Sequence, residues 1–86
     1  MDDETLKKYA YVNISSYRVK AVKSLQKGDK TPTELANDSE IRVNHISKVL
    51  KELKEHEVAE CINEEKRKNR IYRLTDVGHE IVEHLD

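Results

Sequence analysis

Short polar side chains and cations are concentrated in one segment, residues 41–54, which has the pattern of an amphipathic helix. Its apolar positions recur at helical spacing: Ile46, Val49, Leu50 and Leu53. Four polar residues near its start can hydrogen-bond to base edges in a DNA groove: Asn44, His45, Ser47 and Lys48. Cations around them can meet phosphates on either side: Arg42, Lys51 and Lys54. The pattern predicts a recognition helix, residues 43–56, that enters the major groove.

An amphipathic helix with lysines on its polar face is usually a solvated helix that packs on a core. Patterning alone does not separate this interpretation of residues 41–54 from a role in DNA binding. The elements on either side of the helix are therefore needed to decide between them.

A second, shorter helix is predicted immediately before the recognition helix, with a strong start signal at Thr31. Thr31 can cap this helix, Pro32 suits its first position, and Glu34 can complete a capping box. We expect it to end near residues 37–38. Two helices joined in this way form a helix-turn-helix, in which we expect Thr33 to meet the DNA backbone.

At least one more helix is predicted before residue 31. Ser15 or Ser16 can cap it. Gly28 fits the left-handed position after its end, and residues 29–30 then make a turn. Its expected buried face comprises Tyr17, Ala21, Val22 and Leu25. Residues 1–14 predict a short N-terminal helix or an arm.

Two strand-like runs, residues 58–62 and 71–74, follow the recognition helix. The loop between them, residues 63–70, is too long for a two-residue hairpin turn. Its cations are Lys66, Arg67, Lys68 and Arg70. Charged hairpin loops commonly bind nothing, but after a basic helix this loop predicts a wing on the DNA backbone or in the minor groove. A last helix, residues 75–86, is capped by Thr75 or Asp76.

The order helix, turn, helix, hairpin predicts a winged helix-turn-helix, a mainly α fold with a small β-hairpin, in the α+β class. With 86 residues the chain supports a single domain, residues 1–86. Its formal net charge of −1 argues at first against nucleic acid. Residues 42–54 and residues 64–73 each have a local net charge of +3, however, and the last helix has acids but no lysine or arginine. Local charge matters more for docking than the total.

Other classes of protein fit the sequence less well. Cys61 is the single cysteine, so it forms no intrachain disulfide and no Cys-x-x-Cys zinc site. The acidic start does not resemble a secretory leader, and no apolar run reaches the length of a membrane span. We therefore expect a cytoplasmic protein without membrane contact. We expect neither an enzyme nor a cofactor, because no catalytic grouping has supporting context.

Two further possibilities concern the surface of the domain. A metal sensor would use the polar residues of the last helix, Asp76, His79, Glu83 and His84, but solvated side chains are the better interpretation and no metal is expected. A protein-interaction module of the transcription or replication machinery is the main alternative to DNA binding. The acidic last helix fits that alternative.

The chain resembles the small winged helix-turn-helix transcriptional regulators common in archaea, related to the ArsR and MarR types. The matching segments are Ser16–Arg18, Thr31–Ala36, His45–Leu53 and Ile71–Gly78. The resemblance implies operator binding as a homodimer. Two positions depart from the family pattern. Arg42 stands where a capping Ser or Asn is common, and Glu57 stands where Gly often follows the recognition helix.

A homodimer is also expected because a domain of this size buries a limited share of its surface. The termini contain apolar residues with no obvious partner in the helix-turn-helix or hairpin. The expected interface residues are Tyr9, Tyr11, Val12, Ile81, Val82 and Leu85. Alternatively, both termini simply cover the core of their own domain. A symmetric dimer would place half-sites about 34–36 Å apart in a roughly palindromic operator.

Overall fold

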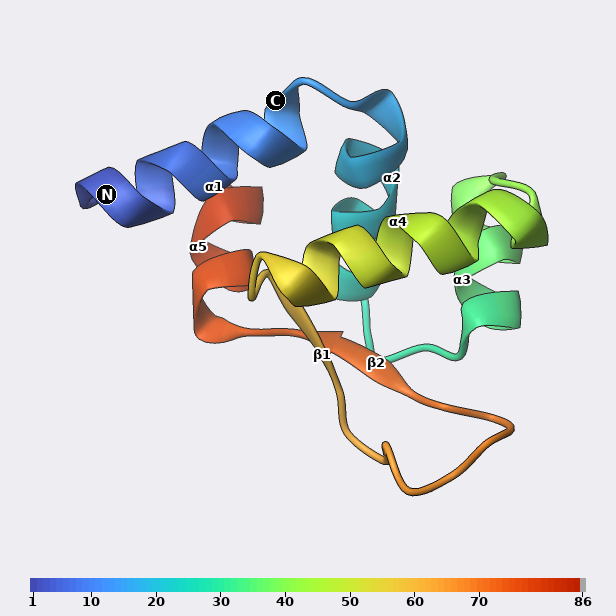
Figure 1. Cartoon of the computed structure of the whole chain (residues 1–86). Helices are drawn as coiled ribbons and strands as arrows, with labels where there is room; N and C mark the ends of the chain where they lie inside the picture. The colour runs from blue at the N-terminus through green and yellow to red at the C-terminus, as the bar shows by residue number, and fades with distance from the viewer. Residues whose placement is uncertain (86) are drawn as a thin grey trace.

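The computed structural model describes residues 1–85 and contains five helices and one hairpin within that range (Figure 1). The elements follow in the order α1 (Asp3–Asn13), α2 (Ser16–Gln26), α3 (Pro32–Ser39), α4 (Val43–Glu55), β1 (Ala59–Cys61), β2 (Tyr72–Leu74) and α5 (Asp76–Glu83). The predicted mainly α fold with a small β-hairpin is confirmed. The predicted last helix is shorter than expected, and Asp86 lies outside the described residues.

Helices α2, α3 and α4 pack together around one apolar core, with α1 and α5 side by side at one end (Figure 1). The largest fully buried side chains include Leu25, Leu35, Ile46, Leu53 and Ile81. All four apolar residues predicted for the recognition helix are buried. Burial of such side chains contributes about 1.5–3 kcal/mol each, so this core is the main source of stability.

Helix starts follow the local sequence closely. Thr31 and Glu34 form the predicted capping box: the Thr31 hydroxyl accepts from the Glu34 N–H, and the Glu34 carboxylate accepts from the Thr31 N–H at 2.9 Å. These bonds hold the pKa of Glu34 below its usual value. Ser15 caps α2, and Thr75 caps α5. Arg42 precedes α4 and forms no side-chain capping bond, because a guanidinium group cannot accept a hydrogen bond from a backbone N–H.

Tyr17 and Gly28 differ from their predicted roles. Tyr17 is 42% exposed rather than on the buried face of α2, where Ser24 lies with Ala21 and other apolar residues. Tyr17 lies in the first turn of α2, where its ring contacts the His45 ring of α4 instead. Gly28 has a φ of 157°, far from the left-handed helical value near +57°. The left-handed residues are instead Glu40, Glu57 and Asn69.

Lys30, predicted to lie in a turn, adds a third backbone segment beside the hairpin. Strands β1 and β2 are antiparallel, with Glu60 opposite Arg73. Lys30 adds a single bridge on the other edge of β2: its N–H donates to the Tyr72 carbonyl at 3.1 Å, and the Tyr72 N–H donates back at 2.8 Å. Since one residue forms this bridge, no strand pattern marks it in the sequence.

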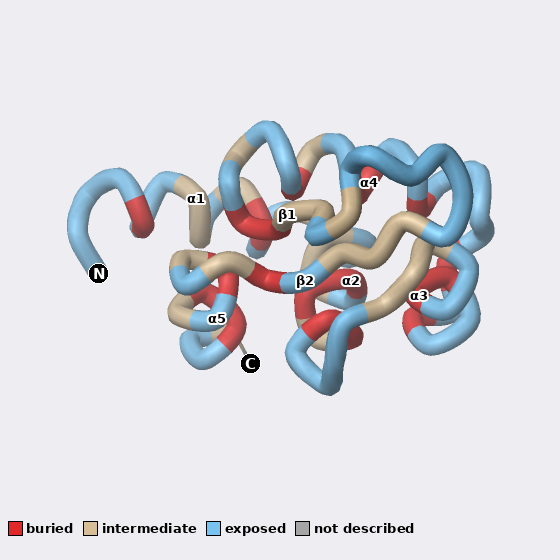
Figure 2. The backbone as a smooth tube through the Cα atoms, turned by 90° about the horizontal axis from the view of Figure 1, so that it is seen from below, coloured by how far each residue is buried: buried red, intermediate tan, exposed pale blue. Residues whose placement is uncertain are grey.

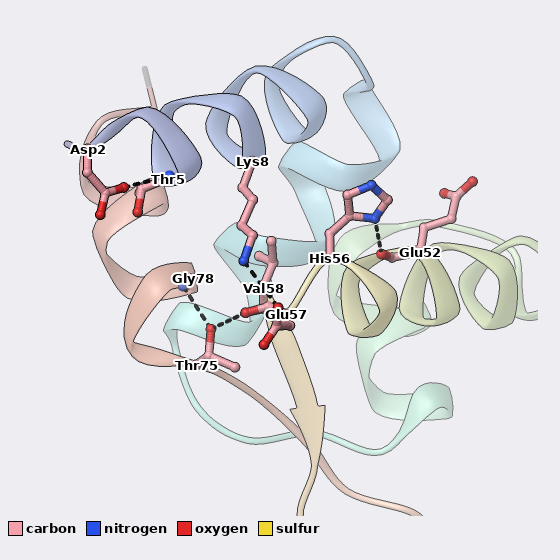
Figure 3. Close-up of polar contacts among 9 residues, drawn as sticks. All are labelled: Asp2, Thr5, Lys8, Glu52, His56, Glu57, Val58, Thr75 and Gly78. Carbon is pink, nitrogen blue, oxygen red and sulfur yellow. Dashed lines mark hydrogen bonds and ion pairs between the residues drawn. The ribbon is translucent and has the colours of Figure 1, made fainter.

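Gly78 permits the close approach of α5 to the link between α4 and β1. A Cβ atom added at Gly78 would lie 2.1 Å from the carbonyl oxygen of Val58. The Thr75 hydroxyl accepts from the Gly78 N–H at 3.0 Å and donates to the Glu57 and Val58 carbonyls at 2.6 and 3.1 Å (Figure 3). The threonine and glycine of the 71–78 segment therefore fasten α5 to the start of the hairpin.

Candidate nucleic-acid interface

The outward face of α4 is polar and points away from the apolar core. Asn44, Lys48, Lys51 and Glu55 recur one turn apart opposite the buried side of the helix, and all four are exposed. In residues 1–85 the side chains of Asn44, Lys48 and Lys51 form no intramolecular hydrogen bond or ion pair. The predicted base contacts Asn44 and Lys48 therefore project directly outward.

One flank of α4 faces the first turn of α2. The rings of His45 and Tyr17 are tilted at 45° with centroids 5.5 Å apart. On the next residue of α2, the Arg18 Nε atom lies 3.4 Å from the Glu52 carboxylate. His45 is thus exposed but in contact with a neighbouring aromatic ring. Tyr17 and Arg18 were not predicted to belong to this surface, although both lie in the family-like segment Ser16–Arg18.

The opposite flank of α4 faces the wing, defined here as residues Ile62–Ile71. Lys54 forms an ion pair with Glu64 of the wing. This contact raises the pKa of Lys54 and lowers the pKa of Glu64. Ser47 lies on the same flank, with its hydroxyl 3.5 Å from the Val43 carbonyl of its own helix. Lys54 therefore already has a carboxylate partner in the free protein, which the prediction of a phosphate contact did not include.

The wing is organised by Asn63 and Arg70. The Asn63 amide accepts from the Ile71 N–H at 2.7 Å and donates to the Asn69 carbonyl at 3.1 Å. Arg70 donates from Nε to the Lys66 carbonyl at 2.7 Å and from an Nη atom to the Glu64 carbonyl at 3.3 Å. Arg70 thus closes the loop, because carbonyls inside the loop lie within its reach, and its DNA contact stays a prediction.

Three other wing cations, Lys66, Arg67 and Lys68, are exposed. A groove of about 560 Å³ lies between the wing and the start of α3. Arg67 and Lys68 line one side of it, and Thr33 lines the other. The structure thus brings the predicted backbone contacts from α3 and from the wing to a common groove, while Arg42 is exposed at the start of α4.

Comparison with solved structures identifies a similar arrangement. A MarR family transcription regulator matches 92% of this chain with a TM-score of 0.75 and 18% sequence identity. The chain has the winged-helix fold. This chain spans about half the length of that regulator, because the match covers 54% of the regulator's chain. The sequence matches no protein family model and no curated protein.

Several residues predicted for a dimer interface belong to the interior of this winged helix. Val12, Ile81 and Val82 are buried in the core of their own chain, so they have almost no surface to offer a second copy. Figure 2 shows buried stretches of backbone in both α1 and α5. Tyr9 and Leu85 are partly buried against the same core. These five residues therefore fit the alternative to an interface, in which the termini cover the core of their own domain.

Tyr11 is also engaged within its own chain. Its ring stacks on His56, and the guanidinium group of Arg18 lies over the same ring. Burial raises the pKa of the Tyr11 hydroxyl. The exposed apolar side chains of the N-terminal region are instead Met1, Leu6 and Ile14. The α1 residues predicted for an interface therefore lie on the inner face of the helix, and the exposed apolar residues lie on its outer face.

In residues 1–85, no three His, Cys, Asp or Glu side chains are grouped closely enough to hold a metal ion. Cys61 is a free, half-buried thiol whose sulfur lies 3.5 Å from the Asn63 amide oxygen. None of the helices within residues 1–85 combines the length and apolar character of a membrane-spanning segment.

Proposed function

We propose that the protein is a transcriptional regulator that binds double-stranded DNA in a sequence-specific manner. The supporting observation is the outward face of α4, where Asn44 and Lys48 project without intramolecular partners beside a wing with exposed cations. In this arrangement α4 enters the major groove, and Asn44, His45, Ser47 and Lys48 contact the bases. Backbone contacts come from Thr33, Arg42, Lys51, Lys54, Lys66, Arg67, Lys68 and Arg70. A cytoplasmic location, where chromosomal DNA would be accessible, is part of this proposal.

The proposed regulator acts as a homodimer through the outer face of α1. Leu6, Ala10 and Ile14 follow one another at four-residue spacing on this face, and Leu6 and Ile14 are 52% and 79% exposed. Exposed apolar rows of this kind commonly mark protein interfaces. Pairing two copies of α1 would cover the row and place two recognition helices in one assembly.

Binding of double-stranded DNA at several salt concentrations tests the proposed function. Fluorescence anisotropy with a labelled random-sequence duplex should show affinity that falls with salt, because cations displace counterions from phosphates. Selection from a random duplex library should then enrich a common sequence. Absence of binding at low salt would contradict the proposal and favour the protein-interaction alternative, which the exposed acids Asp76 and Glu83 of α5 fit.

Sedimentation equilibrium at micromolar concentration tests the dimer. The wild-type protein should have twice the monomer mass, and the Leu6→Ser, Ile14→Ser double variant should shift toward the monomer. An Asn13→Ser variant serves as a control on the exposed surface of the same helix. A monomer mass for the wild type, also in the presence of DNA, would exclude both the dimer and a palindromic operator.

A further inference from the structure

Tyr11 lies at a junction of three helices. Its ring and that of His56 are nearly parallel, at 14°, with centroids 3.6 Å apart. The guanidinium carbon of Arg18 lies 3.7 Å from the same tyrosine centroid. Two groups this close to one centroid must occupy opposite faces of the ring. The Tyr11 ring of α1 is therefore enclosed between α2 and the residue that caps the C-terminal end of α4.

Hydrogen bonds fix the two groups that enclose the ring. Arg18 donates from Nη1 to the Tyr11 carbonyl at 2.8 Å, while its Nε atom pairs with Glu52 of α4 at 3.4 Å. The Nδ1 atom of His56 lies 3.0 Å from the Glu52 carbonyl oxygen (Figure 3). The Arg18 and Glu52 side chains are only 14% and 24% exposed. Solvent therefore screens this pair less than a surface pair.

A second connection joins α1 to the residue after His56. The Lys8 ammonium group lies 3.4 Å from the Glu57 carboxylate (Figure 3). Glu57 has a left-handed backbone, with a φ of 59°, where the chain turns from α4 into the hairpin. Its side chain is 80% exposed, so this ion pair alone holds the helix end weakly. The contacts of the Tyr11 ring are therefore more enclosed than the ion pair between Lys8 and Glu57.

We propose that Tyr11 is a positioning residue for DNA binding, which acts through His56 and Arg18 to fix the C-terminal end of α4 against α1. This inference rests on the proposed function. Nonspecific binding depends mainly on cations near phosphates, whereas base contacts require the recognition helix to sit correctly in the groove. Loss of the Tyr11 ring should therefore reduce specific binding more than nonspecific binding.

The test compares Tyr11→Leu, Tyr11→Phe and the control Asn13→Ala on two duplexes of equal length. One duplex is selected with the wild type from a random library, and the other has random sequence. Tyr11→Leu should bind the selected duplex about ten-fold more weakly, the size of one aromatic pair interaction. Its binding to random DNA should change by less than about two-fold, because all cations are retained.

Tyr11→Phe should keep most of the wild-type sequence preference, since the ring makes both contacts and the variant loses only the hydroxyl, which interacts with the Arg18 side chain. Hydrogen exchange without DNA provides a second measurement. Amides of residues 53–57 should exchange faster in Tyr11→Leu, while the amide of buried Val22 should be unchanged and show that the core remains folded.

The outcomes separate the two proposals. If the wild type binds the selected duplex but Tyr11→Leu binds it equally well, the positioning role is wrong and the proposed function stands. Equal weakening on both duplexes also contradicts positioning. If the wild type binds neither duplex, both proposals are wrong.

Discussion

Lys54 and Glu64 form an ion pair that joins α4 to the wing. In the proposed DNA complex, a phosphate would approach Lys54 on this flank of α4. The phosphate and the Glu64 carboxylate would then compete for one ammonium group.

Glu64→Gln should release Lys54 for a phosphate contact. We expect tighter binding to duplex DNA at low salt and a log K versus log salt slope steeper by about 0.9, the value for one additional phosphate neutralised. Fluorescence anisotropy across a salt series measures both. Glu65→Gln removes the same charge from an exposed neighbour without an ion-pair partner in residues 1–85. Equal effects in both variants would show that overall charge, rather than this ion pair, controls affinity.

Replacing Lys66, Arg67 and Lys68 together by Gln should weaken DNA binding on all sequences alike. For every phosphate that is no longer neutralised, the salt slope should become shallower by about 0.9, while the preferred sequence stays the same. Salt titrations with selected and random duplexes measure these changes. Arg70 is left intact because it closes the loop. Unchanged affinity and slope would identify the wing as a solvated loop.

Asn44→Ala should reduce discrimination between DNA sequences by about 1–3 kcal/mol, the range for one good bidentate base contact. Competition between the selected duplex and single-base variants measures the loss at each position. Asn13→Ala, which removes an exposed amide from α1, is the control. Uniform weakening on every duplex would show that Asn44 contacts the backbone only.

Gly78→Ala should destabilise the fold, because the new methyl group would lie 2.1 Å from the Val58 carbonyl oxygen. Separating α5 from the hairpin to make room should cost about 1–3 kcal/mol, as for overpacked cores. Urea unfolding followed by circular dichroism measures the free energy. Glu83→Ala on the exposed side of α5 is the control. Wild-type stability of Gly78→Ala would mean that α5 can shift freely.

Asp38→Asn should lower the thermal midpoint at neutral pH and have little effect in acid. The Ser24 hydroxyl donates to Asp38 at 2.5 Å and Lys27 pairs with it, and these contacts lower the pKa of Asp38. A lowered folded pKa gives stability that is present above the unfolded value of about 3.9 and lost as pH falls through the folded value.

Thermal melts of wild type and Asp38→Asn between pH 7 and pH 2.5 should therefore converge at the acid end. Asp29→Asn is the matched control, because Asp29 is exposed and has no hydrogen bond or ion pair among residues 1–85. A constant difference between the two melts across the pH range would contradict the assignment.

Local sequence predicted the fold where the interactions are local. The capping box at Thr31, the cap at Thr75 and the apolar face of α4 depend on residues three or four positions apart. Contacts between distant residues were not predictable in this way. Lys30 pairs with Tyr72, and Tyr11 stacks on His56, without any periodic pattern that links the partners.

In the candidate site, too, local positions were predictable and contacts between distant residues were not. The outward position of Asn44 and Lys48 follows from helical spacing and was predicted. The partners of Lys54 and Arg70 depend on how the wing folds back, which spacing does not describe. Val12 and Ile81 looked surplus because the sequence does not show that α1 and α5 cover the core themselves.

The bridge between Lys30 and Tyr72 makes formation of the wing depend on the helices. Strands of three residues in an isolated hairpin are marginal in water, so β1 and β2 need the added support of this bridge. Lys30 lies in the short link between α2 and α3, so the bridge connects β2 to this pair of helices. We expect the wing to form after the helical core and to open first in partial unfolding, independently of the global transition.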